Sequence, residues 1–145
     1  MQIDSIIAQT NQEWTLYIRD DASTDSTREI IADYCAKYSN IIVIEDELGN
    51  LGCYENFRQL LRVIEARYYM FCDADDYWLS DKIQVSYEFI LEKEEVYSSI
   101  PILVHSDKSV ANKELEIIFE SDWLSNRINP DWLSKYAYIP LHIVG

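Results

Sequence analysis

The sequence has 145 residues, of which 48% are hydrophobic and 26% charged, a balance typical of one soluble globular domain. No apolar run reaches the roughly 18 residues that a membrane span requires, and no basic and apolar leader marks a secretory signal. Acidic residues outnumber basic ones by 26 to 12, and the net charge of −14 excludes binding to nucleic-acid phosphates or to an anionic membrane through a basic patch.

The first 40 residues predict a helix, a strand and a second helix, in that order. Isoleucines recur at helical spacing within residues 3–7, so the sequence begins on a short helix. Apolar and polar residues alternate over 14–20, which indicates a strand, and a polar loop follows at 21–25. Ser26 and Glu29 form a capping box that predicts the start of the next helix. The apolar stripe of this helix consists of Ile30, Ile31, Tyr34, Cys35 and Tyr38.

The middle of the sequence repeats this alternation. The run 41–44 is wholly apolar, as expected for a strand in a parallel sheet that is covered on both faces. A glycine-containing loop at 49–52 precedes a helix whose inward residues are Tyr54, Phe57, Leu60, Leu61 and Ile64. Residues 67–72 indicate another strand, which ends in the acidic turn 73–76. Ser80 then predicts the cap of a further helix, whose inward residues are Ile83, Tyr87, Ile90 and Leu91.

Weaker strand signals continue at 102–105 and 115–119. Strands that alternate with helices predict an α/β fold with a Rossmann-like, mostly parallel sheet and flanking helices. Ligands of such sheets bind beyond the carboxyl ends of the strands. Asp20, Asp21 and the turn 73–76 all follow predicted strands, so we expect them to meet at one rim of the sheet.

Two acidic clusters supply the candidate binding residues. Asp73 and Asp75 can aim two carboxylates towards one edge of the sheet, which suits Mg²⁺ or Mn²⁺ bound to the phosphates of a substrate. The same pair fits a solvated acidic turn equally well. Asp20 and Asp21 can accept hydrogen bonds from a nucleoside, and the alternative is a loop that leads into a helix cap. Two such clusters on one sheet support a nucleotide site more strongly than either does alone.

The sequence resembles the family two glycosyltransferases in three segments: RDDASTD at 19–25, NLGCYEN at 50–56 and FCDADDYWLSDK at 71–82. Within that family it is most similar to the bacterial rhamnosyltransferase type of surface-polysaccharide synthesis. The resemblance runs from about residue 2 to residue 82 and continues more loosely to the end. It implies the nucleotide-diphospho-sugar transferase fold known as GT-A, here without its first strand.

The resemblance also implies a role for each matching residue. Asp21 would contact the nucleotide base, with Asp20 beside it. Asp73 and Asp75 would form the D-x-D motif that holds Mg²⁺ or Mn²⁺ on the donor diphosphate. The expected nucleotide-sugar-binding residues are Asp20, Asp21, Gly52, Asn56, Asp73 and Asp75. Trp78 is expected to pack in the core and not to contact the donor.

By the same resemblance, the sequence forms a single domain that is cut short at both ends. Residues 1–100 would bind the donor, and residues 101–145 would begin the acceptor-binding part. The catalytic base is expected beyond Gly145, because no motif marks any of the later carboxylates, Asp107, Asp122 and Asp131. A missing first strand predicts that the strands at 14–20 and 67–72 pair directly, or that a rearranged segment or a neighbouring chain fills the gap; exposed strand edges would then favour a homo-oligomer.

The expected activity is inverting transfer of a sugar from a nucleotide-diphosphate donor to a cell-surface polysaccharide or glycolipid. The expected location is the cytoplasm or the inner face of the membrane. Three alternatives stay open: an inactive donor-binding fragment, a receiver-like signalling module phosphorylated at Asp73 with Lys108 as its lysine, and a phosphatase with Asp73 as nucleophile. That phosphatase motif normally continues with threonine or valine, whereas Asp76 and Tyr77 follow here.

Overall fold

The computed structural model describes residues 1–106 and 108–120. Contacts divide the chain into two units, and the division falls between Val85 and Ser86, inside a helix. Each unit is described below by itself. No helix in the described part is long and apolar enough to cross a membrane.

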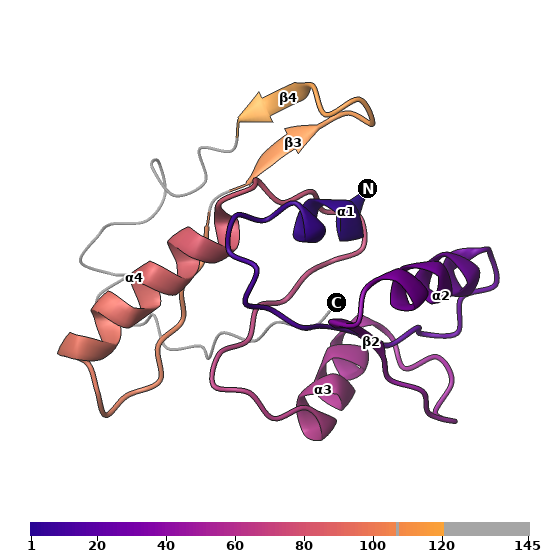
Figure 1. Cartoon of the computed structure of the whole chain (residues 1–145), viewed down its shortest axis with the longest axis horizontal. Helices are drawn as coiled ribbons and strands as arrows, with labels where there is room; N and C mark the ends of the chain where they lie inside the picture. Colours follow the sequence, from indigo (N-terminus) through magenta and orange to yellow (C-terminus); the bar gives the residue numbers. More distant parts are fainter. Residues whose placement is uncertain (107, 121–145) are drawn as a thin grey trace. The chain divides into compact units, whose positions relative to one another are not determined.

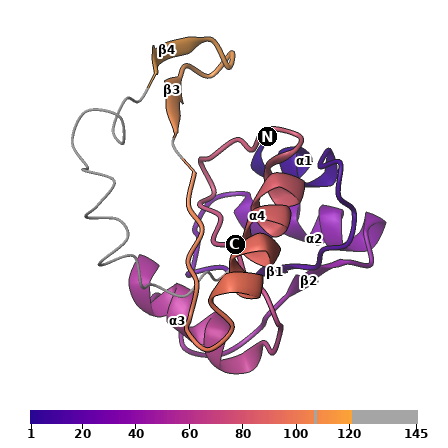
Figure 2. The same ribbon diagram turned by 90° about the vertical axis from the view of Figure 1, so that its left-hand side faces the viewer.

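The sheet of the first unit consists of two parallel strands joined by a helix. β1 (Leu16–Ile18) pairs with β2 (Ile41–Val43) in the register Leu16 to Ile41, and the two strands lie side by side in Figure 2. The helix α2 (Thr27–Lys37) connects them (Figure 1). A parallel pair with a helical crossover confirms the predicted α/β fold.

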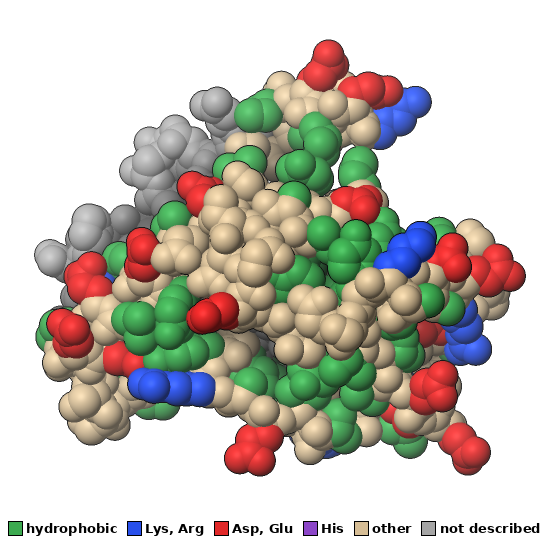
Figure 3. Space-filling view, in the orientation of Figure 1, with side chains coloured by type: hydrophobic (Ala, Val, Ile, Leu, Met, Phe, Trp, Pro, Cys, Tyr) green, Lys and Arg blue, Asp and Glu red, His purple; other side chains and the backbone are tan. Residues whose placement is uncertain are grey.

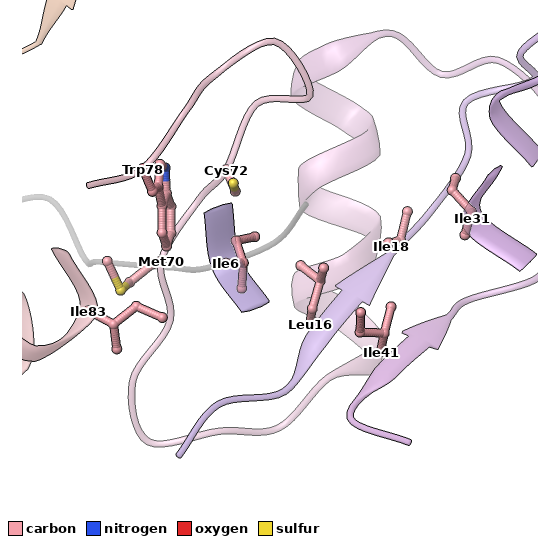
Figure 4. Close-up of a cluster of buried hydrophobic side chains, with 9 residues drawn as sticks. All are labelled: Ile6, Leu16, Ile18, Ile31, Ile41, Met70, Cys72, Trp78 and Ile83. Carbon is pink, nitrogen blue, oxygen red and sulfur yellow. The ribbon is translucent and has the colours of Figure 1, made fainter. Parts of the chain in front are cut away.

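The main hydrophobic core lies between α1 (Gln2–Ile7), β1 and the segment 70–78. Figure 4 shows the side chains of Ile6, Leu16 and Trp78 within this cluster. The remaining buried members are Ile18, Ile31, Ile41, Met70, Cys72 and Ile83. Residues 1–15, all of them described, contain this helix and no strand, as the sequence predicts.

A second, smaller core lies under α3 (Cys53–Val63). Leu60 is fully buried there, next to Ile64 and the half-buried Phe57. The predicted inward residues Phe57, Leu60 and Ile64 are therefore confirmed. The prediction is wrong at Tyr54, which is 73% exposed because it lies in the first turn, ahead of the part of the helix that covers the core.

The strand predicted at 67–72 is wrong, and of the alternatives predicted for the missing first strand, direct pairing is the one that the described residues do not show. No strand is formed over residues 67–72, and among the described strands β1 pairs only with β2, so direct pairing with 67–72 is not found. Met70 and Cys72 are nevertheless buried, beside Ile6 of α1. The apolar residues at 67–72 thus predicted burial correctly. Their pattern cannot show whether the backbone also pairs with a neighbouring strand. β2 is covered on one face only, because Ile42 is 37% exposed.

The predicted N-cap position of Ser26 is confirmed, but its capping hydrogen bond is not formed, and Ser80 is not the residue that caps α4 (Lys82–Val96). Ser26 occupies the N-cap position of α2 but makes no side-chain hydrogen bond; Asp25 Oδ1 accepts the Thr27 N–H instead, at 3.0 Å. The helix α4 begins two residues after Ser80. Its Ile83 N–H donates to the side-chain oxygen of Gln9, at 2.9 Å. Gln9, which is distant in the sequence, therefore accepts the capping hydrogen bond that the local pattern predicted for Ser80.

The described part of the second unit contains the rest of α4 and a β-hairpin. β3 (Ser109–Ala111) and β4 (Ile117–Glu120) pair antiparallel (Figure 1). The Asn112 side chain accepts the N–H groups of Glu114 and Glu116, each at 3.0 Å, and so closes the connecting loop. The strand predicted at 115–119 is confirmed as β4, whereas 102–105 forms no strand.

Candidate functional site

The site begins at Arg19, the first residue after β1. Its side chain is only 2% exposed, yet it carries a charge. Burial of a cation is tolerated when hydrogen-bonding anions surround it, and Arg19 has two. Nε and Nη2 donate to the two carboxylate oxygens of Asp46, both at 2.8 Å, and Nη1 donates to Asp21 Oδ1 at 2.9 Å. This is a bidentate pair with a second carboxylate alongside it.

Two further acceptors complete the environment of the guanidinium. Nη1 also donates to Asn56 Oδ1 at 2.7 Å, and Nη2 donates to the Gly49 carbonyl at 2.9 Å. An arginine has five N–H donors, so every donor of Arg19 has a partner. The Asn56 amide returns a hydrogen bond to the Arg19 carbonyl at 3.2 Å. One side chain thus joins the end of β1, the loop before α3 and the first turn of α3.

Asp21 is held at the N-terminus of α3. Its Oδ1 accepts the Leu51 N–H at 2.7 Å and its Oδ2 accepts the Gly52 N–H at 2.8 Å. A helix N-terminus favours a carboxylate, because its N–H groups have no partner within the helix. Partial burial favours the neutral acid, but these two N–H groups and Arg19 outweigh it and hold the pKa of Asp21 below its ordinary value. Hydrogen bonds from Arg19 and from the Leu48 N–H likewise lower the pKa of Asp46.

Gly52 has a backbone conformation that only glycine adopts readily. Its φ is 76° and its ψ is 158°, while a Cβ added there would have nothing within 4 Å. The requirement for glycine is therefore conformational and not steric. This conformation aims the Gly52 N–H at Asp21.

We expect Gly52→Ala to lower the free energy of unfolding by about 2 kcal/mol, the usual cost of a side chain in this region of backbone space. Urea unfolding would measure the change. The neighbouring exposed Cys53 provides the control, because Cys53→Ala should change stability by less than about 0.5 kcal/mol. A Gly52→Ala variant as stable as the wild type would contradict the prediction.

Asp20, next to Asp21 in the sequence, takes no part in the Arg19 network and has other partners. It accepts the Ser23 N–H at 3.1 Å and Nε of Arg28 at 2.6 Å. Burial alone would raise the pKa of Asp20, but these hydrogen bonds lower it overall. Ala22, which follows the two aspartates, has a φ of 65° and turns the backbone before Ser23. Asp20 therefore organises the loop before α2.

Asp73 and Asp75 lie on an exposed turn. Within the described residues neither carboxylate makes a hydrogen bond or an ion pair, so both face solvent. The same residues contain no group of three or more His, Cys, Asp or Glu side chains that could hold a metal ion. Within the first unit, Figure 3 shows acidic side chains at the surface, among hydrophobic and other polar ones. A metal on this turn would therefore rest on the two carboxylates and take its other ligands from substrate and water.

The segment after this turn is fixed by α1 and the residues that follow it. The Trp78 N–H donates to Ser5 Oγ at 3.1 Å, and Gln9 Nε2 donates to the Leu79 carbonyl at 2.7 Å. The Thr10 N–H donates to the Ser80 carbonyl, also at 2.7 Å. Trp78 itself is 4% exposed, which confirms its predicted role in packing.

Charged and polar groups around the turn are perturbed by burial. Burial, with Asp76 nearby, raises the pKa of the Cys72 thiol to about 12, so this thiol stays protonated. Burial lowers the pKa of Lys82, although Asp76 opposes the change. The Lys82 ammonium lies 5.3 Å from the centre of the Trp78 ring, within cation–π range.

An aromatic contact joins α3 to the segment just before the acidic turn. The rings of Phe57 and Phe71 meet edge to face with centroids 5.0 Å apart. Asn56 precedes Phe57, and Asp73 follows Phe71 by two residues. No hydrogen bond or ion pair between described residues joins Asp73 or Asp75 to Asp21.

Comparison with known proteins adds a family. The profile described as Glycosyl transferase family 2 matches residues 2–139, almost the whole chain. The chain belongs to glycosyl transferase family 2. The match confirms the resemblance seen in the three segments and the α/β fold of the family. It also decides against the receiver-like and phosphatase alternatives.

Three relatives show which family 2 proteins are similar. A Bacillus subtilis protein named as a glycosyltransferase of teichuronic acid biosynthesis is 33% identical over 96 residues, which is 66% of this chain and 38% of the relative. A dTDP-rhamnosyl transferase of Shigella flexneri is 29% identical over 132 residues, 83% of this chain and 46% of the relative. A poly(ribitol-phosphate) beta-glucosyltransferase of Bacillus spizizenii is 31% identical over 94 residues, 63% of this chain and 15% of the relative. The chain therefore spans less than half the length of these relatives.

The structure brings together three of the six predicted site residues, Asp21, Gly52 and Asn56. It places Asp20 on other partners, and it puts Asp73 and Asp75 on a separate turn. Arg19 and Asp46, the pair that organises the site, were not among the predicted site residues; the available signal was a basic residue directly between a buried strand and two acids. The later carboxylates Asp107, Asp122 and Asp131 lie outside the described residues.

Proposed function

We propose that this chain is the donor-binding part of an inverting, metal-dependent glycosyltransferase that acts on a cell-surface polysaccharide or glycolipid. The observation that carries the proposal is the arrangement around Arg19. Beyond the carboxyl end of β1, it fixes Asp21 and Asn56 at the N-terminus of α3, where an α/β sheet binds its ligand. Family membership and the glycosyltransferase names of the relatives support the same activity.

In this proposal Asp21 receives the nucleoside. Its Oδ1 already accepts two hydrogen bonds, from Arg19 and Leu51, whereas its Oδ2 accepts one, from Gly52. Each carboxylate oxygen has about two acceptor positions, so Oδ2 keeps one for a ligand. The Asp21 side chain is 22% exposed, which leaves it accessible. An N–H or hydroxyl donor of a nucleoside fits this position.

Asp73 and Asp75 are the residues that would hold Mg²⁺ or Mn²⁺. Their carboxylates are hard oxygen ligands on an exposed turn, and two such ligands suffice for an ion that keeps water and phosphate oxygens around it. Such an ion would neutralise negative charge on the diphosphate of the donor.

The proposed reaction is a single displacement. A carboxylate base removes the proton of an acceptor hydroxyl, the hydroxyl oxygen attacks the anomeric carbon, and the nucleoside diphosphate departs with inversion. The described residues contribute donor binding to this scheme. The catalytic base stays unassigned, and the proposed location is the cytoplasmic side of the membrane.

Calorimetry with UDP, dTDP, CDP and GDP, each with and without Mn²⁺, tests the proposal on the 145-residue chain. We expect one or more of these nucleotides to bind, with Mn²⁺ strengthening the affinity. Asp75→Ala should then weaken binding in the presence of Mn²⁺ by at least about tenfold, equivalent to about 1.4 kcal/mol.

Asp33→Ala is the matched control, because Asp33 is an exposed aspartate on α2 outside the site, and its loss should leave affinity unchanged. Binding that ignores Mn²⁺ and is the same in Asp75→Ala would remove the metal assignment. Failure of all four nucleotides to bind would remove the function.

A further inference from the structure

We propose that Arg19 is the positioning residue of the nucleoside site: it presents Asp21 to the nucleoside and never touches the ligand itself. This inference rests on the proposed function and deepens it by naming the residue that sets the geometry. The observation behind it is that a single nitrogen, Nη1, donates its two hydrogens to Asp21 and to Asn56, at 2.9 and 2.7 Å.

Direct contact between Arg19 and a ligand is excluded by its environment. All five N–H donors already have protein acceptors, and the side chain is 2% exposed. A ligand oxygen would have to displace one of these acceptors from a buried position. Arg19 therefore acts through the groups that it holds.

Arg19 limits the directions in which Asp21 can accept hydrogen bonds. Together with the Leu51 N–H it occupies Oδ1, and the Gly52 N–H occupies one position of Oδ2. Rotation of the carboxylate would break all three hydrogen bonds. The single open position on Oδ2 is thus fixed in space, as a preorganised binding site requires.

Asp46 prevents Arg19 from turning. It binds Nε and Nη2 as a fork, and a planar guanidinium held at two nitrogens has one orientation. Asn56 adds a reciprocal constraint, because its Oδ1 accepts from Nη1 while its Nδ2 donates to the Arg19 carbonyl. The orientation of the Asn56 amide is therefore also determined by Arg19.

The experiment compares two probes on the same variants: UDP with Mn²⁺, and inorganic pyrophosphate with Mn²⁺; dTDP replaces UDP if the wild type prefers it. UDP uses both the nucleoside and the diphosphate contacts, whereas pyrophosphate uses only the latter. Arg19→Lys retains the positive charge but cannot form the fork. We expect it to weaken UDP binding about tenfold or more and to leave pyrophosphate affinity within about twofold, since Arg19 makes no hydrogen bond to Asp73 or Asp75.

A double-mutant cycle with Asp21→Asn gives the second measurement. If Arg19 acts through Asp21, the loss caused by Arg19→Lys should largely disappear in the Asp21→Asn background. Arg58→Met serves as the control, because Arg58 also pairs with a carboxylate, Glu55, but is 46% exposed on α3. Asp46→Asn, which leaves Arg19 and Asp21 intact, replaces Arg19→Lys if the latter does not fold, with the same expected pattern.

The outcomes separate this inference from the proposed function. Equal loss of UDP and pyrophosphate affinity would show a merely structural role and overturn the positioning role alone. Unchanged UDP affinity in folded Arg19→Lys would also overturn it. A wild type that binds neither probe would overturn the proposed function, and this inference with it.

Discussion

Arg19→Met should lower the free energy of unfolding by about 3 kcal/mol at pH 7, the usual result of removing one partner from a buried ion pair. Methionine fills a similar volume but leaves Asp21 and Asp46 without their shared cation. Both carboxylates retain partial exposure, 22% and 20%, which keeps the expected loss at the lower end for such sites. Urea unfolding followed by circular dichroism would measure it.

The pH dependence of this loss has a definite sign. Arg19 contributes to holding the pKa values of Asp21 and Asp46 below their ordinary values in the folded protein. Such groups stabilise the fold above their unfolded pKa, and the contribution is lost as the pH falls through the folded pKa. The stability difference between wild type and Arg19→Met should therefore shrink as the pH is lowered below about 4. A difference that is constant from pH 7 to pH 3 would contradict the ion-pair account, and Arg58→Met should show little difference at either pH.

Gln9→Met should lower the free energy of unfolding by a similar amount, about 3 kcal/mol, through lost hydrogen bonds at nearly constant volume. Gln9 is 2% exposed and connects two backbone groups, the Leu79 carbonyl and the Ile83 N–H. Each group left buried without a partner costs about 1 to 3 kcal/mol. Thermal or urea unfolding would give the value.

Gln12→Met provides a control of identical chemistry. Gln12 lies three residues further along, is exposed, and donates only to carbonyl groups near the end of α1. We expect its loss to change stability by less than about 0.5 kcal/mol. Equal effects of the two substitutions would show that the buried amide contributes nothing specific.

The paired strands of the first unit were predictable, because the pattern of apolar residues in the sequence matches the residues that are buried. The alternation around Leu16 and the apolar run at Ile41 both became paired strands, and the motif at Asp21 did follow the end of β1. Trp78 was predicted to pack, and it is buried. In each case the residue's own neighbours in sequence determine the outcome.

The network of the candidate site could not be predicted in the same way. The partners of Arg19 lie 27 residues away at Asp46 and 37 residues away at Asn56, and no periodicity relates them. Gln9, as the cap of α4, is a polar residue whose partner lies 74 residues further on. Local capping rules therefore favoured Ser80 as the cap of α4, whereas the tertiary structure places Gln9 where it accepts the Ile83 N–H.

The hydrogen bonds of Ser5 and Gln9 also have a consequence for the order of folding. They span 70, 73 and 74 residues, so the loop that they close contains β1, β2, α2 and α3. Closing so long a loop costs entropy that only later contacts repay, and structures of high contact order form slowly. We therefore expect the segment after the acidic turn 73–76 to become ordered late in folding, because its partners on and after α1 lie at the other end of the unit.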